Sequence, residues 1–233
     1  MTDRLVIDRG HSATCGVRVK ICGLTRMSDT DAALNAGASY IGLVRFPRSP
    51  RHISIALARN LVARAEGRAV RTVLVVDPTD SEICTLQRNI PFDLLQLHGS
   101  ESPERIATIR NMAPWQIMKA VGLAGKADLA KLAEYEAVAD QILVDARPKD
   151  DVALPGGNGL TFDWTLLENA VFTKPWMLAG GLNAGNVATA IRLTGASQVD
   201  VSSGIEAAPG LKDPAKIAEF VAAARYKASA DES

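Results

Sequence analysis

The sequence predicts an α/β fold made of one domain, a (β/α)8 (TIM) barrel, and three observations support this class. Short apolar, β-branched runs alternate with longer helical patterns along the chain, and eight such pairs can be counted. The 233 residues give about 29 residues per pair, and eight pairs of this size approach the roughly 250 residues of a typical (β/α)8 barrel. The alternative, an open doubly wound sheet, usually has a G-x-G-x-x-G turn after its first strand, whereas the first run here continues as Cys22-Gly23-Leu24-Thr25-Arg26.

The expected strands are the short runs rich in Val, Ile and Leu, and the expected helices are the longer segments between them. We expect strands at Val17–Cys22, Tyr40–Val44, Val70–Val76, Leu94–His98, Gln116–Ala120, Gln141–Asp145, Trp176–Ala179 and Gln198–Val201. We expect helices at Ser28–Ala36, Ile55–Ala65, Ser81–Arg88, Pro103–Asn111, Lys126–Ala137, Thr165–Asn169, Ala184–Thr194 and Asp213–Arg225. Three helix starts carry an N-cap residue followed by Pro or an acidic residue, namely Ser28, Ser102 and Asp213.

One domain accounts for nearly the whole chain. We expect the barrel over residues 17–226, an N-terminal extension over residues 1–16 and a flexible C-terminal tail over residues 227–233, which is small and polar. The extension has no continuous apolar segment of the kind found in a signal peptide. We assign no role to it.

Composition excludes several classes of partner. Lys+Arg 26 balances Asp+Glu 26, and no block of basic residues occurs, so we expect no nucleic-acid partner. No apolar stretch approaches the roughly 18 residues that a membrane span needs, so we expect no membrane partner either. We expect a monomer or a homodimer.

Cysteine and histidine spacing argues against a metal site or a disulfide framework. Cys15, Cys22 and Cys84 form no C-x-x-C pair, which fits a reducing, cytoplasmic setting. The three histidines lack an i,i+4 or H-E-x-x-H spacing, so we expect no metal.

In a (β/α)8 barrel the active site forms at the C-terminal ends of the strands, so the residues where each apolar run stops are informative. A thiol at Cys22 or a carboxyl at Asp145 is able to transfer protons if its surroundings adjust its pKa. The alternatives are an inert buried thiol at Cys22 and, at Asp145, a carboxylate that caps a helix or bonds a loop. His98 is either a ligand-binding or a structural imidazole. The full set of strand stops is Cys22, Arg51, Asp77, His98, Lys119, Asp145, Gly180-Gly181 and Ser202-Ser203-Gly204.

Glycine-rich segments indicate a phosphate site. The loops after the seventh and eighth strands contain Gly181, Ser203 and Gly204, and such loops commonly bind phosphate in these barrels through backbone N–H groups. A third cluster, 155–159, allows a mobile lid over the ligand, with a flexible connection that makes no ligand contact as the alternative.

Several motifs in collinear order resemble the phosphoribosylanthranilate isomerase family of tryptophan biosynthesis. They are Val19-Lys20-Ile21-Cys22-Gly23-Leu24-Thr25-Arg26, Ser49-Pro50-Arg51, Gln96-Leu97-His98-Gly99, Leu143-Val144-Asp145, Gly156-Gly157-Asn158-Gly159 with Phe162-Asp163-Trp164, Leu178-Ala179-Gly180-Gly181-Leu182, and Val199 to Glu206 with Pro209-Gly210 and Lys212-Asp213.

The resemblance implies an Amadori rearrangement of N-(5-phosphoribosyl)anthranilate without a cofactor. It implies that Asp145 is the general acid, Cys22 the general base and Arg51 the residue that holds the anthranilate carboxylate. The phosphate is then expected at Gly157, Gly181, Ser203 and Gly204, with His98 as a further substrate contact.

One residue departs from the family pattern, and two other functions compete with the isomerase. Arg45 stands where the family usually has an aromatic residue, so its charge must point into the mouth or be paired beside the helical layer. A non-catalytic phosphosugar-binding barrel needs neither Cys22 nor Asp145. A related histidine-pathway isomerase is expected to use an aspartate where Cys22 stands.

Overall fold

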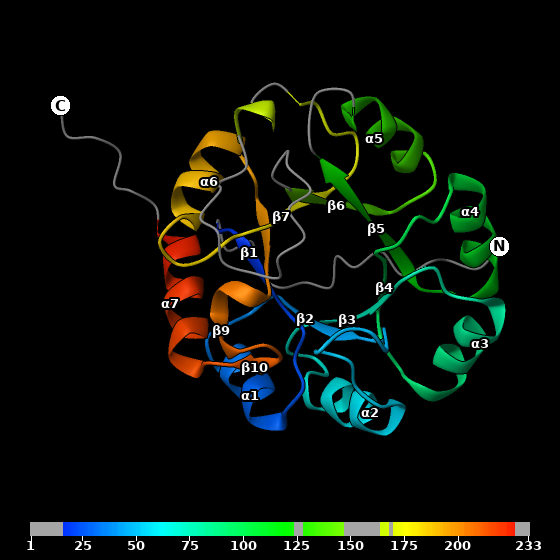
Figure 1. The fold of residues 1–233 in the computed structure, drawn as a ribbon, viewed down its shortest axis with the longest axis horizontal. Coiled ribbons are helices and arrows are strands. Elements are labelled where there is room, and N and C mark those ends of the chain that lie inside the picture. Colours follow the sequence, from blue (N-terminus) through cyan, green and yellow to red (C-terminus); the bar gives the residue numbers. More distant parts are fainter. Residues whose placement is uncertain (1–15, 124–127, 147–163, 168–169, 227–233) are drawn as a thin grey trace.

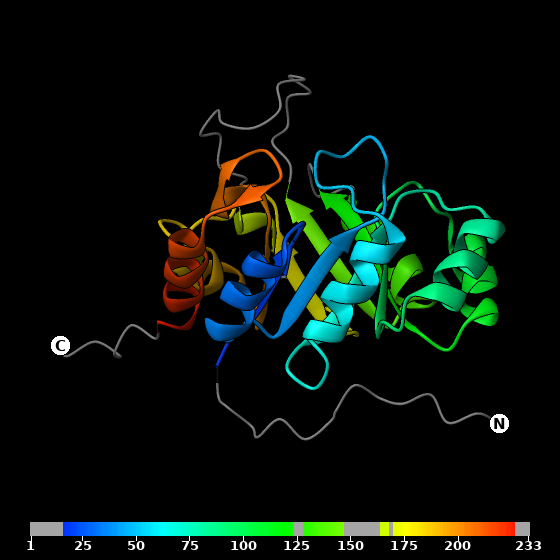
Figure 2. The same ribbon diagram turned by 90° about the horizontal axis from the view of Figure 1, so that it is seen from below.

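The computed structural model describes residues 16–123, 128–146, 164–167 and 170–226. The described residues form a closed barrel of eight parallel strands in sequential order, which confirms the predicted fold class. Helices surround the barrel in Figure 1, and the strand arrows in Figure 2 point toward the same end. The short hairpin of β9 (Glu206–Ala208) and β10 (Leu211–Lys212) also lies at this end. The strands are β1 (Arg18–Cys22), β2 (Tyr40–Val44), β3 (Val70–Val75), β4 (Leu94–Leu97), β5 (Gln116–Leu123), β6 (Gln141–Ala146), β7 (Trp176–Ala179) and β8 (Gln198–Val201).

The α-helices of the outer layer follow the strands that they cover. They are α1 (Met27–Asn35), α2 (Ile55–Arg64), α3 (Asp80–Asn89), α4 (Pro103–Met112), α5 (Leu129–Glu136), α6 (Val187–Thr194) and α7 (Pro214–Arg225). Between β6 and β7 the structure has a 3-10 helix, η2 (Trp164–Leu167), and after β8 a second, η3 (Ser203–Ile205), which leads into β9 (Glu206–Ala208) and β10 (Leu211–Lys212).

The predicted helix starts are partly correct. Ser102 and Asp213 cap α4 and α7 through their side chains, as expected. Ser28 is not a cap, because α1 begins at Met27 and the cap position is Arg26, without a side-chain bond. The prediction missed the capping box of α3, in which Thr79 and Glu82 bond each other's backbone N–H groups.

Some element bounds also differ from the prediction. β5 continues to Leu123, three residues beyond the expected end, and β4 stops at Leu97, before His98. The described part of the sixth connection has a 3-10 turn where an α-helix was expected. Residues 184–186 form a turn, so α6 starts at Val187.

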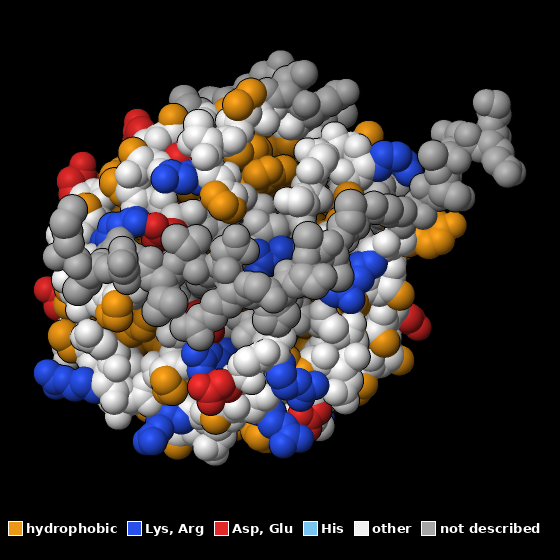
Figure 3. Space-filling model, turned by 180° about the vertical axis from the view of Figure 1, so that it is seen from behind, with side chains coloured by type: hydrophobic (Ala, Val, Ile, Leu, Met, Phe, Trp, Pro, Cys, Tyr) orange, Lys and Arg blue, Asp and Glu red, His pale blue; other side chains and the backbone are white. Residues whose placement is uncertain are grey.

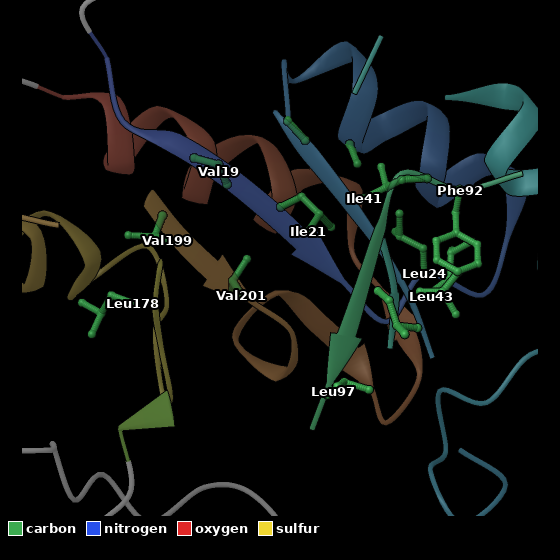
Figure 4. Packing of buried hydrophobic residues seen from close by; sticks show 14 of the residues in the cluster. Val19, Ile21, Leu24, Ile41, Leu43, Phe92, Leu97, Leu178, Val199 and Val201 are labelled. Atoms are coloured by element: carbon green, nitrogen blue, oxygen red, sulfur yellow. The ribbon is translucent and has the colours of Figure 1, made fainter. Parts of the chain in front are cut away.

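Two apolar layers divide the core according to strand alternation. The larger cluster lies between the sheet and the helices, and Figure 4 shows Val19, Ile21, Ile41 and Val199 within it. The smaller clusters line the barrel interior with the alternate residues, such as Leu94, Met118 and Leu143. A residue's position in this alternation therefore decides whether its side chain enters the barrel or the helical layer.

Polar residues fill one cross-section of the barrel interior. The hydroxyl of Tyr40 donates to Gln198 Oε1 at 2.7 Å, and the amide of Gln141 donates to the same oxygen at 3.0 Å. All three residues are at the start of their strands, so this network lies at the end of the barrel opposite the mouth.

Figure 3 shows Lys and Arg side chains and Asp and Glu side chains scattered over the described part of one face. Among the described residues, no helix combines the length and hydrophobicity required to cross a bilayer.

Candidate active site

Cys22, the last residue of β1, lies at the mouth of the barrel and is 4% exposed. Its neighbour in the sheet is Gly42 of β2, where an added Cβ would lie 2.9 Å from the Cys22 Sγ. A larger residue at position 42 would therefore displace the thiol. This close approach is the physical reason for a glycine within the strand.

Buried charges surround the Cys22 thiol. Lys20, on the same face of β1, is fully buried and donates to Asp200 of β8 at 2.8 Å. Burial raises the pKa of the Cys22 thiol and the Asp200 carboxylate raises it further, whereas Lys20 and Lys212 oppose this shift. The protonated thiol is therefore the favoured form at neutral pH in this structure.

We expect the alkylation rate of Cys22 by iodoacetamide to keep rising with pH beyond about 8.5, where an ordinary thiol titrates. The reason is that a raised pKa lowers the thiolate fraction at any given pH. The measurement uses a Cys15→Ser/Cys84→Ser background, so that Cys22 is the thiol that reacts. Lys212→Met should move the profile to still higher pH, because it removes a cation that favours the thiolate. A rate that is already maximal at pH 7 would contradict this expectation.

Asp145, near the end of β6, faces His98 across the mouth. The His98 Nε2 lies 3.5 Å from the Asp145 Oδ2, and the two side chains are 26% and 23% exposed. His98 Nδ1 lies 2.9 Å from the amide nitrogen of Gln96, which is fully buried on β4. An open pocket at the mouth is lined by His98, Gly99, Ala120, Gly122 and Asp145. A ligand in this pocket would contact the carboxyl and the imidazole together.

Arg51, in the loop after β2, packs directly over Gly23, where an added Cβ would collide with the arginine side chain. Its Nε and Nη2 donate to the two carboxylate oxygens of Glu206 at 2.6 and 2.7 Å. Lys212 donates to Glu206 at 2.8 Å from the other side. Burial would raise the pKa of Glu206, but the bonds from Arg51 and Lys212 outweigh it and hold the pKa below its usual range. Glu206 is thus a carboxylate that fixes two cations next to Cys22.

The loops after β7 and β8 touch each other at the mouth. Gly180 and Gly181 have φ of +94° and +63°, which favours glycine at both positions. A Cβ on Gly204 would collide with the carbonyl oxygen of Leu182, so the second loop packs against the backbone of the first. Gly181 and Ser203 are exposed. Gly157 and the rest of the expected lid, 155–159, lie outside the described residues.

Two of the expected mouth residues do not line the pocket beside Asp145. Lys119 lies between Met118 and Ala120, whose side chains face the interior, so its own side chain enters the helical layer. There it bonds Glu101 at 2.6 Å, and both side chains are buried. Asp77 has φ +45° and accepts hydrogen bonds from Ser100. Both side chains therefore bond residues of the β4–α4 loop.

Sequence reasoning missed the buried polar residues that support the site. Glu206 and Asp200 belong to a quoted motif, yet nothing local indicated their partners, which are 155 and 180 residues away in the chain. A signal was available in Lys20 and Gln96, since a charged or amide side chain within an apolar strand requires a buried partner.

Arg45 points into the helical layer. It donates to the backbone carbonyl of Ile53 and lies 3.4 Å from His52 Nε2. Together with Ile55, Val75 and Glu82 it lines a hollow outside the barrel. The guanidinium is thus hydrogen-bonded to a carbonyl and attracted by Glu82, and it adds no positive charge to the mouth.

Residues 19–223 match the family described as N-(5'phosphoribosyl)anthranilate (PRA) isomerase. This match covers most of the chain. The chain belongs to the phosphoribosylanthranilate isomerase family. It is 54% identical over 210 residues to the N-(5'-phosphoribosyl)anthranilate isomerase of Cereibacter sphaeroides. These residues make up 90% of this chain and 99% of the relative. The enzyme of the same name from Rhodospirillum centenum is 53% identical over 210 residues, covering 89% of this chain and 98% of the relative.

Solved phosphoribosylanthranilate isomerases have the same fold. The structure from Thermotoga maritima superposes with a TM-score of 0.79 at 34% identity, covering 89% of this chain and 98% of that one. A family member solved in complex with reduced 1-(o-carboxyphenylamino)-1-deoxyribulose 5-phosphate gives a TM-score of 0.76 at 32% identity, with coverage of 89% and 98%. The family membership of this chain makes it an isomerase.

Proposed function

We propose that this chain converts N-(5-phosphoribosyl)anthranilate to 1-(2-carboxyphenylamino)-1-deoxyribulose 5-phosphate, with Asp145 as general acid and Cys22 as general base. The observation that carries the proposal is the presence of both groups at the C-terminal ends of strands in one closed barrel. A non-catalytic phosphosugar-binding barrel would need only the glycine loops after β7 and β8.

The reaction requires two proton transfers. Asp145 gives a proton to the furanose ring oxygen while the bond from that oxygen to C1 breaks, and the nitrogen lone pair forms an imine with C1. Cys22, as thiolate, then removes the proton from C2. The electrons of that C–H bond form a C1–C2 double bond, and the C1–N π electrons return to nitrogen. The resulting enolamine becomes the ketone when C1 takes up a proton and the C2 hydroxyl loses one. No electron leaves or enters the substrate, so these steps need no redox cofactor, in line with the expectation of no cofactor.

The raised pKa of the Cys22 thiol bears on this proposal. A general base must be deprotonated, so only the thiolate fraction is active. Lys20 and Lys212 counteract burial and Asp200. The same two ammonium groups are therefore the ones that would stabilise the base form.

The substrate would bind through the side chains of Arg51 and His98 and through backbone N–H groups of the glycine loops. Arg51 would hold the anthranilate carboxylate with the guanidinium N–H groups that Glu206 leaves available. Glu206 occupies Nε and Nη2 of Arg51, and Nη1 has no hydrogen-bond partner among the described residues. His98 would contact the substrate beside Asp145. Backbone N–H groups at Gly181, Ser203 and Gly204, with Gly157, would bind the phosphate.

The function is tested by following the loss of phosphoribosylanthranilate fluorescence with the purified chain. Turnover that scales with protein concentration supports the proposal. Binding of the phosphosugar without turnover would instead favour the non-catalytic barrel.

We expect inorganic phosphate and sulfate to inhibit competitively, because backbone donors in glycine loops accept any compact dianion. The measurement is the apparent KM at several anion concentrations and constant ionic strength, since screening alone mimics weak inhibition. Chloride at the same ionic strength is the control. A crystal from sulfate with an anion elsewhere and none at these loops would count against the assignment.

We expect Arg51→Lys to raise KM about 10- to 100-fold and to change kcat less. Hydrogen bonds to a charged group contribute about 1.5–3 kcal/mol, and the substrate carboxylate is equally charged in the ground and transition states. Steady-state kinetics separates the two effects. The matched control is Arg48→Lys, whose side chain lies exposed in the same loop. If only the control raised KM, the carboxylate would bind elsewhere.

We further propose a cytoplasmic location, a phosphorylated small molecule as the partner, no nucleic-acid partner, and a monomeric or homodimeric state. Cys22 and Cys84 are free thiols, which fits a reducing compartment. A relative from Thermotoga maritima is described as dimeric, with monomers generated from it. Light scattering of the purified chain decides between the two states.

A further inference from the structure

Gln96 is a buried amide that the proposed reaction does not use. It lies on β4 between Leu95 and Leu97, which face the helical layer, so its side chain enters the barrel. The side chain is fully buried, and its Oε1 has no hydrogen-bond partner among the described residues. Its amide nitrogen lies 2.9 Å from His98 Nδ1, two residues further on the same face. Among the described residues, this contact is the one hydrogen bond of the Gln96 side chain.

His98 connects this amide to Asp145. One ring nitrogen faces the buried Gln96, and the other lies 3.5 Å from the Asp145 Oδ2 at the open pocket. The three side chains thus form a row that leads from the barrel interior to the proposed general acid.

The amide group of Gln96 selects one form of the imidazole. A neutral imidazole carries one hydrogen, and its other nitrogen is an acceptor. An amide N–H that donates to Nδ1 requires Nδ1 to be the acceptor, so the hydrogen is on Nε2. Nε2 is the nitrogen that faces Asp145.

We propose that Gln96 is a positioning residue that holds His98 in the Nε2–H form, so that His98 donates a hydrogen bond to Asp145. This inference rests on the proposed function, in which Asp145 is the acid. When the Asp145 proton moves to the furanose oxygen, a carboxylate remains, and the Nε2–H bond stabilises it. The imidazole hydrogen stays on His98 throughout.

The tautomer decides the direction of the effect. An Nε2–H donor interacts more strongly with the carboxylate that develops in the transition state than with the neutral acid. It therefore lowers the activation free energy of the proton transfer from Asp145. The opposite tautomer would present a lone pair to Asp145 and stabilise the protonated acid. Loss of the Gln96 contact should therefore act on kcat and leave KM nearly unchanged.

The first experiment measures the tautomer directly by NMR of the full chain labelled with ¹⁵N-histidine. The chain has three histidines, so His11→Gln and His52→Gln assign the His98 signals. Above the pH at which the imidazole is protonated, we expect Nδ1 to give the shift of an unprotonated nitrogen and Nε2 that of a protonated one. Gln96→Glu offers an acceptor to Nδ1 and should move hydrogen to that nitrogen.

The second experiment is the kinetics of Gln96→Leu, for which we expect kcat to fall about 10- to 100-fold with KM within about twofold. Gln141→Leu is the matched control, since it replaces a buried glutamine at the opposite end of the barrel, and it should leave the His98 spectrum unchanged.

A wild-type spectrum with hydrogen on Nδ1 would overturn the proposal, and so would a change confined to KM in Gln96→Leu. If that variant does not fold, the wild-type spectrum alone decides. The spectrum does not depend on turnover, so a chain without isomerase activity would refute the proposed function independently of the tautomer.

Discussion

Asp145→Asn is expected to lower kcat by about 10²–10⁴-fold, the range for loss of one proton-transfer group. The amide has nearly the shape of the carboxyl and can therefore keep the contact with His98, but the transferable proton is lost. Cys22→Ser should have a similar effect, because a hydroxyl is a far weaker acid than a thiol and provides almost no anionic base near neutral pH.

These two variants are compared with the wild type by steady-state kinetics and by thermal unfolding. The serine is smaller than the cysteine, so it does not collide with Gly42, and we expect both variants to remain folded. Cys84→Ser on α3 is the control and should retain full activity. Wild-type turnover in a folded Asp145→Asn or Cys22→Ser variant would show that the assigned role is wrong.

Breaking the Lys119–Glu101 pair is expected to reduce the free energy of unfolding by about 3–5 kcal/mol, because removal of one partner leaves an uncompensated charge in the helical layer. The two groups lie 2.6 Å apart with side-chain exposures of 2% and 1%. Glu101 also accepts from the backbone N–H groups of Gly99 and Asp77, so it ties together the loops after β3 and β4. Lys119→Met removes the ammonium and keeps most of the side-chain volume.

Urea unfolding of Lys119→Met, Glu101→Gln and the double variant measures this effect. The double variant should lose less stability than the sum of the single variants, because neither charge is then left unpaired. Arg64→Met, which breaks the exposed pair with Asp31, is the control and should cost at most about 1 kcal/mol. A loss of that small size in Lys119→Met as well would contradict the expectation.

The strand and helix pattern of this chain could be predicted because it depends on local spacing. Each of the eight expected strands overlaps a strand of the barrel, and the helix caps at Ser102 and Asp213 are correct. Errors occurred where tertiary context overrides a local signal, as at Ser28, which resembles a cap and lies inside α1.

The sequence by itself determined the fold class, the family motifs and the residues at which each strand ends, because apolar periodicity and short motifs are properties of neighbouring residues. Only the tertiary structure decided which of those residues face a ligand. Lys119 turned outward to Glu101, and Arg51 was fixed by Glu206, which is 155 residues away in the chain. The Arg51–Glu206 pair forms only when the barrel closes and brings β1, β2, β8 and their loops together, so its energy depends on a distance that no local pattern contains.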